Sequence, residues 1–125
     1  PHAGEAARLL GRERAEVEAG RLGAARELAA RAGAVVVLKG PGTITAAPDG
    51  RVVVNGTGSA ALATAGTGDV LTGALAALLA KGMEPLAAAA AAVAAHGRAA
   101  ELAGRGDGTI ASDVLEALPE AMRPA

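Results

Sequence analysis

A glycine-rich turn that runs directly into a helix constrains the fold of this chain more than any other segment. The turn is Gly66-Thr67-Gly68, and Asp69 opens the helix that leucine spacing predicts over residues 69–81. Glycines let the backbone approach an anion closely, and the first amides of a helix lack intrahelical acceptors. The helix dipole also favours negative charge at this end. The segment predicts a phosphate site with a carboxylate beside it, although an ordinary strand-to-helix turn with an aspartate gives the same pattern.

A second candidate segment follows the most strand-like run in the chain. Residues 34–38 are mainly β-branched, which is typical of a strand buried on both faces of a parallel sheet. Lys39-Gly40-Pro41-Gly42-Thr43 comes next, and ligands of α/β proteins gather beyond the carboxyl ends of strands. The segment is not a Walker A loop, because no Gly-Lys-Ser/Thr follows a four-residue gap. We expect Lys39 to face a ligand; a lysine that extends to solvent is the alternative.

The remaining segments complete an α/β pattern. Residues 43–45 and 52–54 flank Pro48-Asp49-Gly50, which predicts a hairpin. Gly33 predicts the end of one helix. The cation and glycine of Lys81-Gly82 predict the end of another. The segments in which helices are expected are 1–11, 12–17, 20–32, 69–81, 85–103 and 109–118. Helices and strands in this order predict the α/β class.

Composition limits the core and the partners. The chain has no Phe, Tyr or Trp, so its core must come from Leu, Val, Ile and alanine. Its net charge is −1, from 12 basic and 13 acidic residues, and neither a basic stripe nor an aromatic platform indicates nucleic acid as a partner. It has no cysteine and only two histidines, His2 and His96, which predicts no protein-ligated metal. The longest alanine run, residues 86–95, is too short to cross a membrane, and we expect a cytoplasmic protein.

Three regions, in order along the chain, resemble the ADP- or ATP-dependent NAD(P)H-hydrate dehydratases of the ribokinase-like superfamily. Residues 1–5, Pro-His-Ala-Gly-Glu, are similar to the family's Pro-His-Pro-Gly-Glu, with Ala3 in place of the second proline. Residues 38–43 are similar to its Leu-Lys-Gly-x-x-Thr segment. Asn55-x-x-Gly58 and residues 63–73 are similar to its signature. The resemblance extends over nearly the whole chain.

The resemblance implies a fold and a domain organisation. The fold is a ribokinase-like three-layer α/β/α sandwich with a mainly parallel sheet. Residues 1–125 are expected to be the C-terminal part of a single domain, because no segment in them is similar to the family's N-terminal half. A surface rich in alanine and leucine and free of aromatics suggests helix packing between subunits, so we expect a homo-oligomer.

The resemblance also implies the reaction and the residues that carry it. Asp69 is the general base that takes a proton from the ring hydroxyl of hydrated NADH or NADPH as the nucleotide's terminal phosphoryl group is transferred. Loss of phosphate then restores the reduced nicotinamide, which is a carbon–oxygen lyase reaction. Gly66, Thr67 and Gly68 form the anion hole, and His2 contacts the hydrated cofactor together with Asp69. The residues that bind ADP or ATP, with Mg²⁺, are Lys39, Gly40, Pro41, Gly42 and Thr43.

Partners and alternatives complete the interpretation. An epimerase that acts on the same hydrated cofactor, fused or separate, is an expected partner. A small-molecule kinase of the same superfamily, such as one for a vitamin precursor, is an alternative that leaves a stable phosphorylated product. An inactive nucleotide-binding fragment that lacks half of its site is another. We expect His96, in an alanine-rich helix, to be a satisfied packing or capping residue rather than a ligand.

Overall fold

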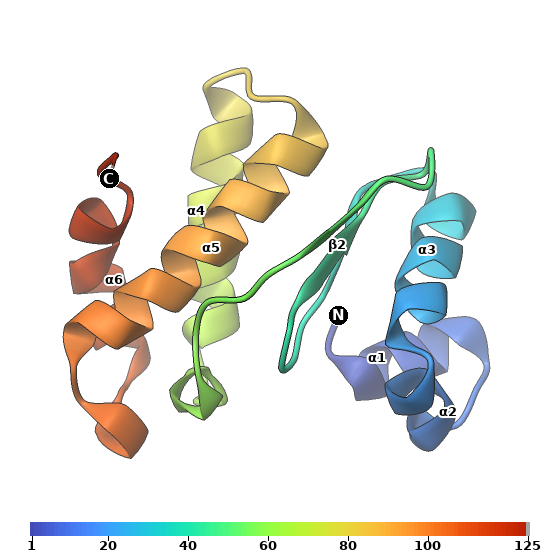
Figure 1. The fold of residues 1–125 in the computed structure, drawn as a ribbon, viewed down its shortest axis with the longest axis horizontal. Coiled ribbons are helices and arrows are strands. Elements are labelled where there is room, and N and C mark those ends of the chain that lie inside the picture. The colour runs from blue at the N-terminus through green and yellow to red at the C-terminus, as the bar shows by residue number, and fades with distance from the viewer. Residues whose placement is uncertain (125) are drawn as a thin grey trace. The chain divides into compact units, whose positions relative to one another are not determined.

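The computed structural model describes residues 1–124 and divides the chain into two compact units, Pro1–Asn55 and a second unit that begins at Gly56. The elements of the first unit are α1 (Ala3–Leu10), α2 (Arg14–Ala19), α3 (Arg21–Ala32), β1 (Val36–Leu38), β2 (Ile44–Ala46) and β3 (Val52–Val54) (Figure 1). Those of the second are η1 (Ala60–Leu62), α4 (Thr67–Ala80), α5 (Pro85–Ala103), η2 (Gly106–Gly108) and α6 (Ala111–Ala121). Every expected helix is present, within a few residues of its expected bounds.

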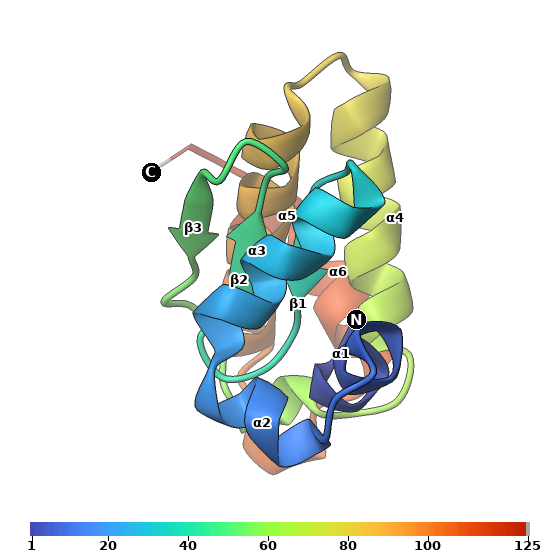
Figure 2. The same ribbon diagram turned by 90° about the vertical axis from the view of Figure 1, so that its right-hand side faces the viewer.

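In the first unit, α3 packs against β1 and β2 (Figure 2). Ala25 and Ala29 of α3 are completely buried, as is Leu38 at the end of β1. Alanines on the inner face of a helix let its backbone approach the sheet closely, so a core without aromatic rings can still be dense. Val17 of α2 is also buried and extends this core. The end of β1, where the loop from Lys39 to Thr43 starts, is therefore fixed by close packing.

The sheet has the order β1-β2-β3, and both pairs are antiparallel. Ile44 pairs with Val54 and Ala46 with Val52, which confirms the hairpin around Pro48-Asp49-Gly50. The expected parallel arrangement is not found among the strands of residues 1–124, because β1 also pairs antiparallel with β2. The physical reason is the short loop after β1: a β-branched run indicates burial but not strand direction, and the glycines of this loop allow the chain to turn back at once.

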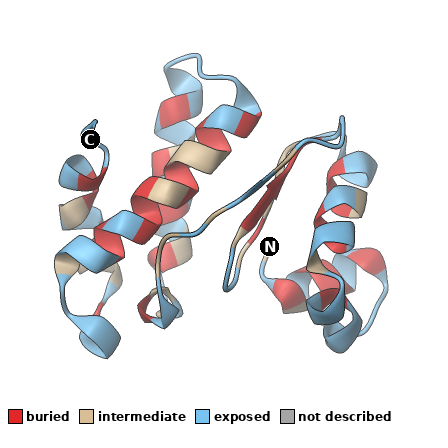
Figure 3. Ribbon diagram, in the orientation of Figure 1, coloured by how far each residue is buried: buried red, intermediate tan, exposed pale blue. Residues whose placement is uncertain are grey.

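In the second unit, α5 contacts both α4 and α6 (Figure 1). Its buried residues, coloured red in Figure 3, are mostly alanines, with Leu86, Val93 and His96 among them. Glu84 caps the helix through the amide of Ala87, and Gly104 ends it in a left-handed conformation. A long helix of small residues thus forms the centre of this unit and can lie close to the loops beside it.

Two short 3₁₀ turns, η1 and η2, were not expected from the sequence. Each is a single turn of three residues, and such a turn has no apolar periodicity by which it can be predicted. Among residues 1–124, no helix combines the length and the apolar character that crossing a membrane requires.

Candidate active site

The turn before α4 is shaped by a glycine in a left-handed conformation. Gly66 is the N-cap and adopts a left-handed conformation with φ of 86°. A side chain here would be strained, and its Cβ would lie 3.2 Å from the Cβ of Ala111. Thr67 and Gly68 occupy the first two helical positions, and Asp69 the third. The helix thus begins at Thr67, two residues before the expected start at Asp69. Thr67 and Gly68 of the glycine turn are therefore part of the helix.

Thr67 anchors the turn through its hydroxyl and its carbonyl oxygen. Its hydroxyl lies 2.7 Å from the carbonyl oxygen of Leu62 and 2.9 Å from that of Thr64, to which it can donate. Its own carbonyl oxygen lies 2.8 Å from Nε2 of His96. The side chains of Thr67 and His96 are both buried, so none of these bonds competes with bulk water. The expectation that His96 is a satisfied structural histidine is confirmed.

Two groups at this turn, the amide of Gly68 and the carboxylate of Asp69, have no protein partner among residues 1–124. The amide of Asp69 donates to the carbonyl of Gly66 at 3.1 Å, but the amide of Gly68 has no acceptor among residues 1–124. The carboxylate of Asp69 is exposed, and within the same residues it makes no hydrogen bond or ion pair. A free amide at a helix N-terminus and a free carboxylate one residue later can bind an anion and accept a proton beside it.

Helix α5 also holds the start of the glycine-rich loop that precedes the turn. The hydroxyl of Thr57 donates to the carbonyl of Ala94 at 3.1 Å, and the amide of Gly58 donates to Oε1 of Glu101 at 2.9 Å. Gly97 makes this approach possible, because a Cβ there would lie 2.8 Å from the nitrogen of Gly58. The loop is therefore attached to α5 at both of its ends, here and at His96.

The loop after β1, in the first unit, is a compact turn shaped by its two glycines. Gly40 has φ of 144° and Gly42 has φ of 61°. The hydroxyl of Thr43 donates to the carbonyl of Gly40 at 3.0 Å, and Lys39 is half-buried. The expected nucleotide-binding residues thus lie together, and Thr43 stabilises the loop from within.

Arg21, which belongs to none of the sequence motifs, supports this loop. Its side chain is only 15% exposed, and Nη2 lies 3.3 Å from the carbonyl oxygen of Leu38 and 3.5 Å from that of Gly42. A Cβ at Gly40 would approach Nη1 to 2.6 Å, so the glycine leaves room for the guanidinium. No local motif contains Arg21, since it lies 17 residues before Leu38 in the chain.

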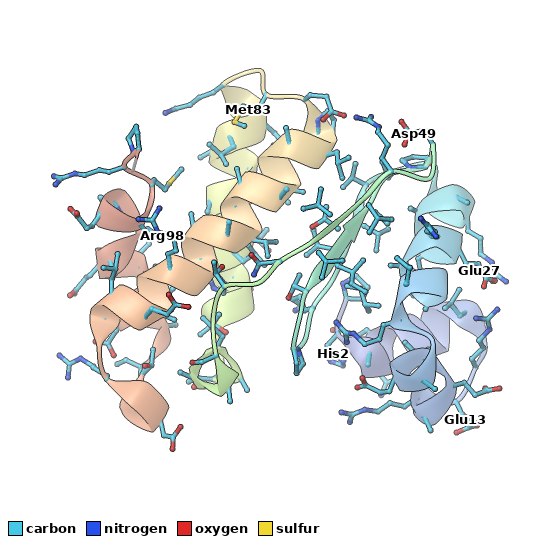
Figure 4. The ribbon with its side chains drawn as sticks, viewed as in Figure 1. His2, Glu13, Glu27, Asp49, Met83 and Arg98 are labelled. Atoms are coloured by element: carbon cyan, nitrogen blue, oxygen red, sulfur yellow. The ribbon has the colours of Figure 1, made fainter. Side chains whose placement is uncertain are left out.

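His2, labelled in Figure 4, caps α1 and lies in the same unit as the loop from Lys39 to Thr43. Its Nδ1 accepts from the amides of Gly4 at 3.1 Å and Glu5 at 3.3 Å, while its own amide donates to Oε2 of Glu5 at 2.8 Å. This bond from the His2 amide is the main reason that the pKa of Glu5 lies below its ordinary value. The amide of Lys39 donates to the carbonyl of Pro1 at 2.8 Å, which joins the Pro-His segment to the end of β1.

The candidate residues therefore form two sets. One set is His2 with Lys39, Gly40, Pro41, Gly42 and Thr43 in the first unit, and the other is Gly66, Thr67, Gly68 and Asp69 in the second. No group of three or more histidines, cysteines or carboxylates within residues 1–124 could hold a metal ion. A divalent cation at such a site would have to be bound mainly by phosphates and water.

The chain is similar to known proteins over most of its length. The family model described as NAD(P)H-hydrate dehydratase matches residues 1–120. The chain is 47% identical to the ADP-dependent (S)-NAD(P)H-hydrate dehydratase of Neisseria meningitidis, over 94% of this chain and 41% of that protein. It is 45% identical to the bifunctional NAD(P)H-hydrate repair enzyme of Moorella thermoacetica, over 98% of this chain and 24% of that protein.

The chain is also similar to solved structures of this kind of protein. The ADP/ATP-dependent NAD(P)H-hydrate dehydratase of Bacillus subtilis, co-crystallised with ATP and Mg²⁺, matches with a TM-score of 0.88 and 39% identity. The match includes 97% of this chain and 45% of that one. The ribokinase-like fold expected from the sequence is that of these structures, and the chain spans less than half the length of these relatives.

Proposed function

Because the chain belongs to the NAD(P)H-hydrate dehydratase family, we propose that it serves in the nucleotide-dependent dehydration of hydrated NADH and NADPH. One observation carries the proposal: at the N-terminal turn of α4, the Gly68 amide and the Asp69 carboxylate one residue later both have no protein partner within residues 1–124. These are the two groups that a phosphoryl transfer to a hydroxyl requires, one for the developing charge and one for the proton.

In this reaction Asp69 accepts the proton of the ring hydroxyl while that oxygen forms its bond to the terminal phosphorus of the nucleotide. The bond from that phosphorus to the bridging oxygen breaks, and the nucleotide, shortened by one phosphate, leaves with the bridging oxygen. The amide of Gly68, supported by the turn from Gly66, stabilises the charge on the transferred group. Phosphate then leaves with the electrons of the ring carbon–oxygen bond, and a proton lost from the neighbouring ring carbon restores the double bond. The overall change is that of a carbon–oxygen lyase.

The first unit supplies the remaining contacts in this proposal. The glycine loop from Lys39 to Thr43 binds ADP or ATP, and two of its features support this: its two glycines with positive φ and the cation at its start. Mg²⁺ bound with the nucleotide would neutralise charge on the phosphates. His2 contacts the hydrated cofactor through its ring, of which Nδ1 is already engaged in capping α1.

The wider setting of the reaction is part of the same proposal. An epimerase activity, fused or separate, would convert the unreactive epimer of the hydrated cofactor, and the bifunctional relatives support this. Residues 1–125 would be the C-terminal part of a single dehydratase domain, and assembly into a homo-oligomer remains a prediction. We place the protein in the cytoplasm, where adenine nucleotides and reduced nicotinamide cofactors are metabolised.

The test is recovery of reduced-nicotinamide absorbance from hydrated cofactor, with ADP or ATP and Mg²⁺. We expect Asp69→Asn to lower the rate by about 10²–10⁴-fold, because it removes the base. Asp107→Asn, which changes an exposed aspartate in η2, is the matched control and should leave the rate unchanged. A stable phosphorylated product without recovery of absorbance would identify a kinase instead. Nucleotide binding without either product would identify an inactive binding protein.

A further inference from the structure

The hydrogen bond between His96 and Thr67 connects the centre of α5 to the proposed anion hole. His96 is 6% exposed, and its Nε2 lies 2.8 Å from the carbonyl oxygen of Thr67. A carbonyl oxygen can only accept, so Nε2 must carry the hydrogen in this bond. A buried imidazole N–H thus points at the backbone of the residue that opens α4.

The geometry of the peptide group extends the effect of this bond by one residue. The carbonyl of Thr67 and the amide of Gly68 belong to the same peptide unit, which is planar, and the described chain contains no cis peptide bond. In a trans unit the C=O and N–H bonds point in opposite directions. When His96 fixes the carbonyl, it also fixes the direction of the Gly68 N–H, which has no acceptor among residues 1–124.

The same bond strengthens the Gly68 amide as a donor. A hydrogen bond to the carbonyl oxygen draws electron density away from the nitrogen and polarises its N–H bond. The effect is not screened by water, because Thr67 and His96 are both buried. The bond from His96 to Thr67 therefore polarises the Gly68 amide, the donor that has no acceptor among residues 1–124.

We propose that His96 is a positioning residue for the anion hole, which aims and polarises the Gly68 amide through the carbonyl of Thr67. The proposal rests on the proposed function for the ligand that the amide serves. It goes beyond packing, because packing alone requires only an apolar side chain of similar volume at position 96. It also explains a polar ring at the centre of a helix whose other buried residues are small or apolar.

Two variants separate the hydrogen bond from the packing. His96→Leu keeps the volume and removes the donor, whereas His96→Gln keeps an N–H donor at a similar reach. Thr109→Val is the matched control, because it removes another buried hydrogen bond of the second unit, from the hydroxyl of Thr109 to the carbonyl of Gly106 at 2.7 Å. That bond does not involve the peptide between Thr67 and Gly68.

The first readout needs no activity. In ¹H–¹⁵N spectra of the intact protein, we expect the Gly68 amide proton to move upfield in His96→Leu, to stay near its original position in His96→Gln, and to be unaffected in Thr109→Val. Titration with Mg²⁺·ADP should show affinity lowered by about tenfold in His96→Leu alone, the loss that a weakened hydrogen bond to a charged group causes. An unchanged Gly68 resonance in folded His96→Leu would overturn the proposal.

The second readout is the dehydration rate. The charge on the phosphoryl group develops in the transition state, so kcat should fall by about tenfold or more in His96→Leu while KM for the hydrated cofactor stays nearly constant. His96→Gln should restore most of kcat. If His96→Leu lowers stability but does not lower kcat at nearly constant KM, then His96 has only a structural role. If the wild-type protein shows no dehydration but its Gly68 amide depends on His96, the proposed function fails and the positioning role stands.

Discussion

Arg21 shows how much a single side chain outside any motif contributes to the candidate site. Its guanidinium has two loop carbonyls as acceptors, those of Leu38 and Gly42, and an ion pair to Glu18 at 3.7 Å. We expect Arg21→Met to lower the free energy of unfolding by about 1–3 kcal/mol, because the partly buried carbonyl of Leu38 loses this donor. The same change should weaken Mg²⁺·ADP binding, since the loop from Lys39 to Thr43 becomes free to move.

Urea unfolding and a nucleotide titration would measure both effects. Arg31→Met is the matched control, because Arg31 lies on the same helix but is exposed and pairs with Glu27 at its surface. Its substitution should change stability by roughly 0.5 kcal/mol or less. Equal nucleotide affinity in Arg21→Met and the wild type would show that the loop keeps its shape without the arginine.

At the scale of single elements, α1 depends on a carboxylate that titrates. The pKa of Glu5 is lowered from its ordinary value of 4.5, mainly by the hydrogen bond from the His2 amide, with smaller contributions from the charges of His2 and Lys39. Because the folded pKa is the lower one, Glu5 contributes stability above pH 4.5 that is lost as the pH falls through the lowered pKa. The difference in stability between the wild type and Glu5→Gln should therefore be largest at neutral pH and vanish in acid. A difference that is independent of pH in unfolding curves would contradict the capping role of the carboxylate.

The contact between α5 and the glycine-rich loop depends on one glycine. In Gly97→Ala the new Cβ would meet Thr57 Oγ1 and lie 2.7 Å from the Thr57 carbonyl carbon, so the loop must move away from the helix. We expect a loss of about 1–3 kcal/mol in the free energy of unfolding. Gly73→Ala in α4 is the control, since nothing lies within 4 Å of its Cβ, and a helical alanine should stabilise by roughly 0.5–1 kcal/mol. Thermal unfolding of the two variants should shift in opposite directions.

The sequence predicted those features that depend on neighbouring residues. Helix ends at Gly33 and Gly82 follow from the left-handed conformation that glycine adopts easily, and the hairpin follows from Pro48-Asp49-Gly50. The antiparallel pairing of β1 could not be predicted, because a β-branched run contains no information on direction. The bonds from His96 to Thr67 and from Arg21 to Leu38 join residues 29 and 17 positions apart, and no local pattern indicates them.

At the scale of the whole molecule, each of the two units holds one set of candidate residues. The loop from Lys39 to Thr43 belongs to the first unit and the turn from Gly66 to Asp69 to the second. A nucleotide stabilises each unit that it binds, and at a concentration 100 times Kd it adds about 2.7 kcal/mol to the folded state. We therefore expect Mg²⁺·ADP to slow amide hydrogen exchange in α3 and β1 as well as in α4 and α5.

A variant of the turn makes this prediction specific. Gly66→Ala should prevent the left-handed N-cap, since the residue has φ of 86° and its new Cβ would press on Ala111. We expect this change to reduce the protection that Mg²⁺·ADP gives to α4 and α5, because the turn that precedes α4 loses its shape. Protection of α3 and β1 that persists in Gly66→Ala would show that the loop from Lys39 to Thr43 binds the nucleotide without help from the turn. Unchanged protection of α4 and α5 would show instead that nucleotide binding does not depend on the conformation of Gly66, and this result would contradict the proposed anion hole.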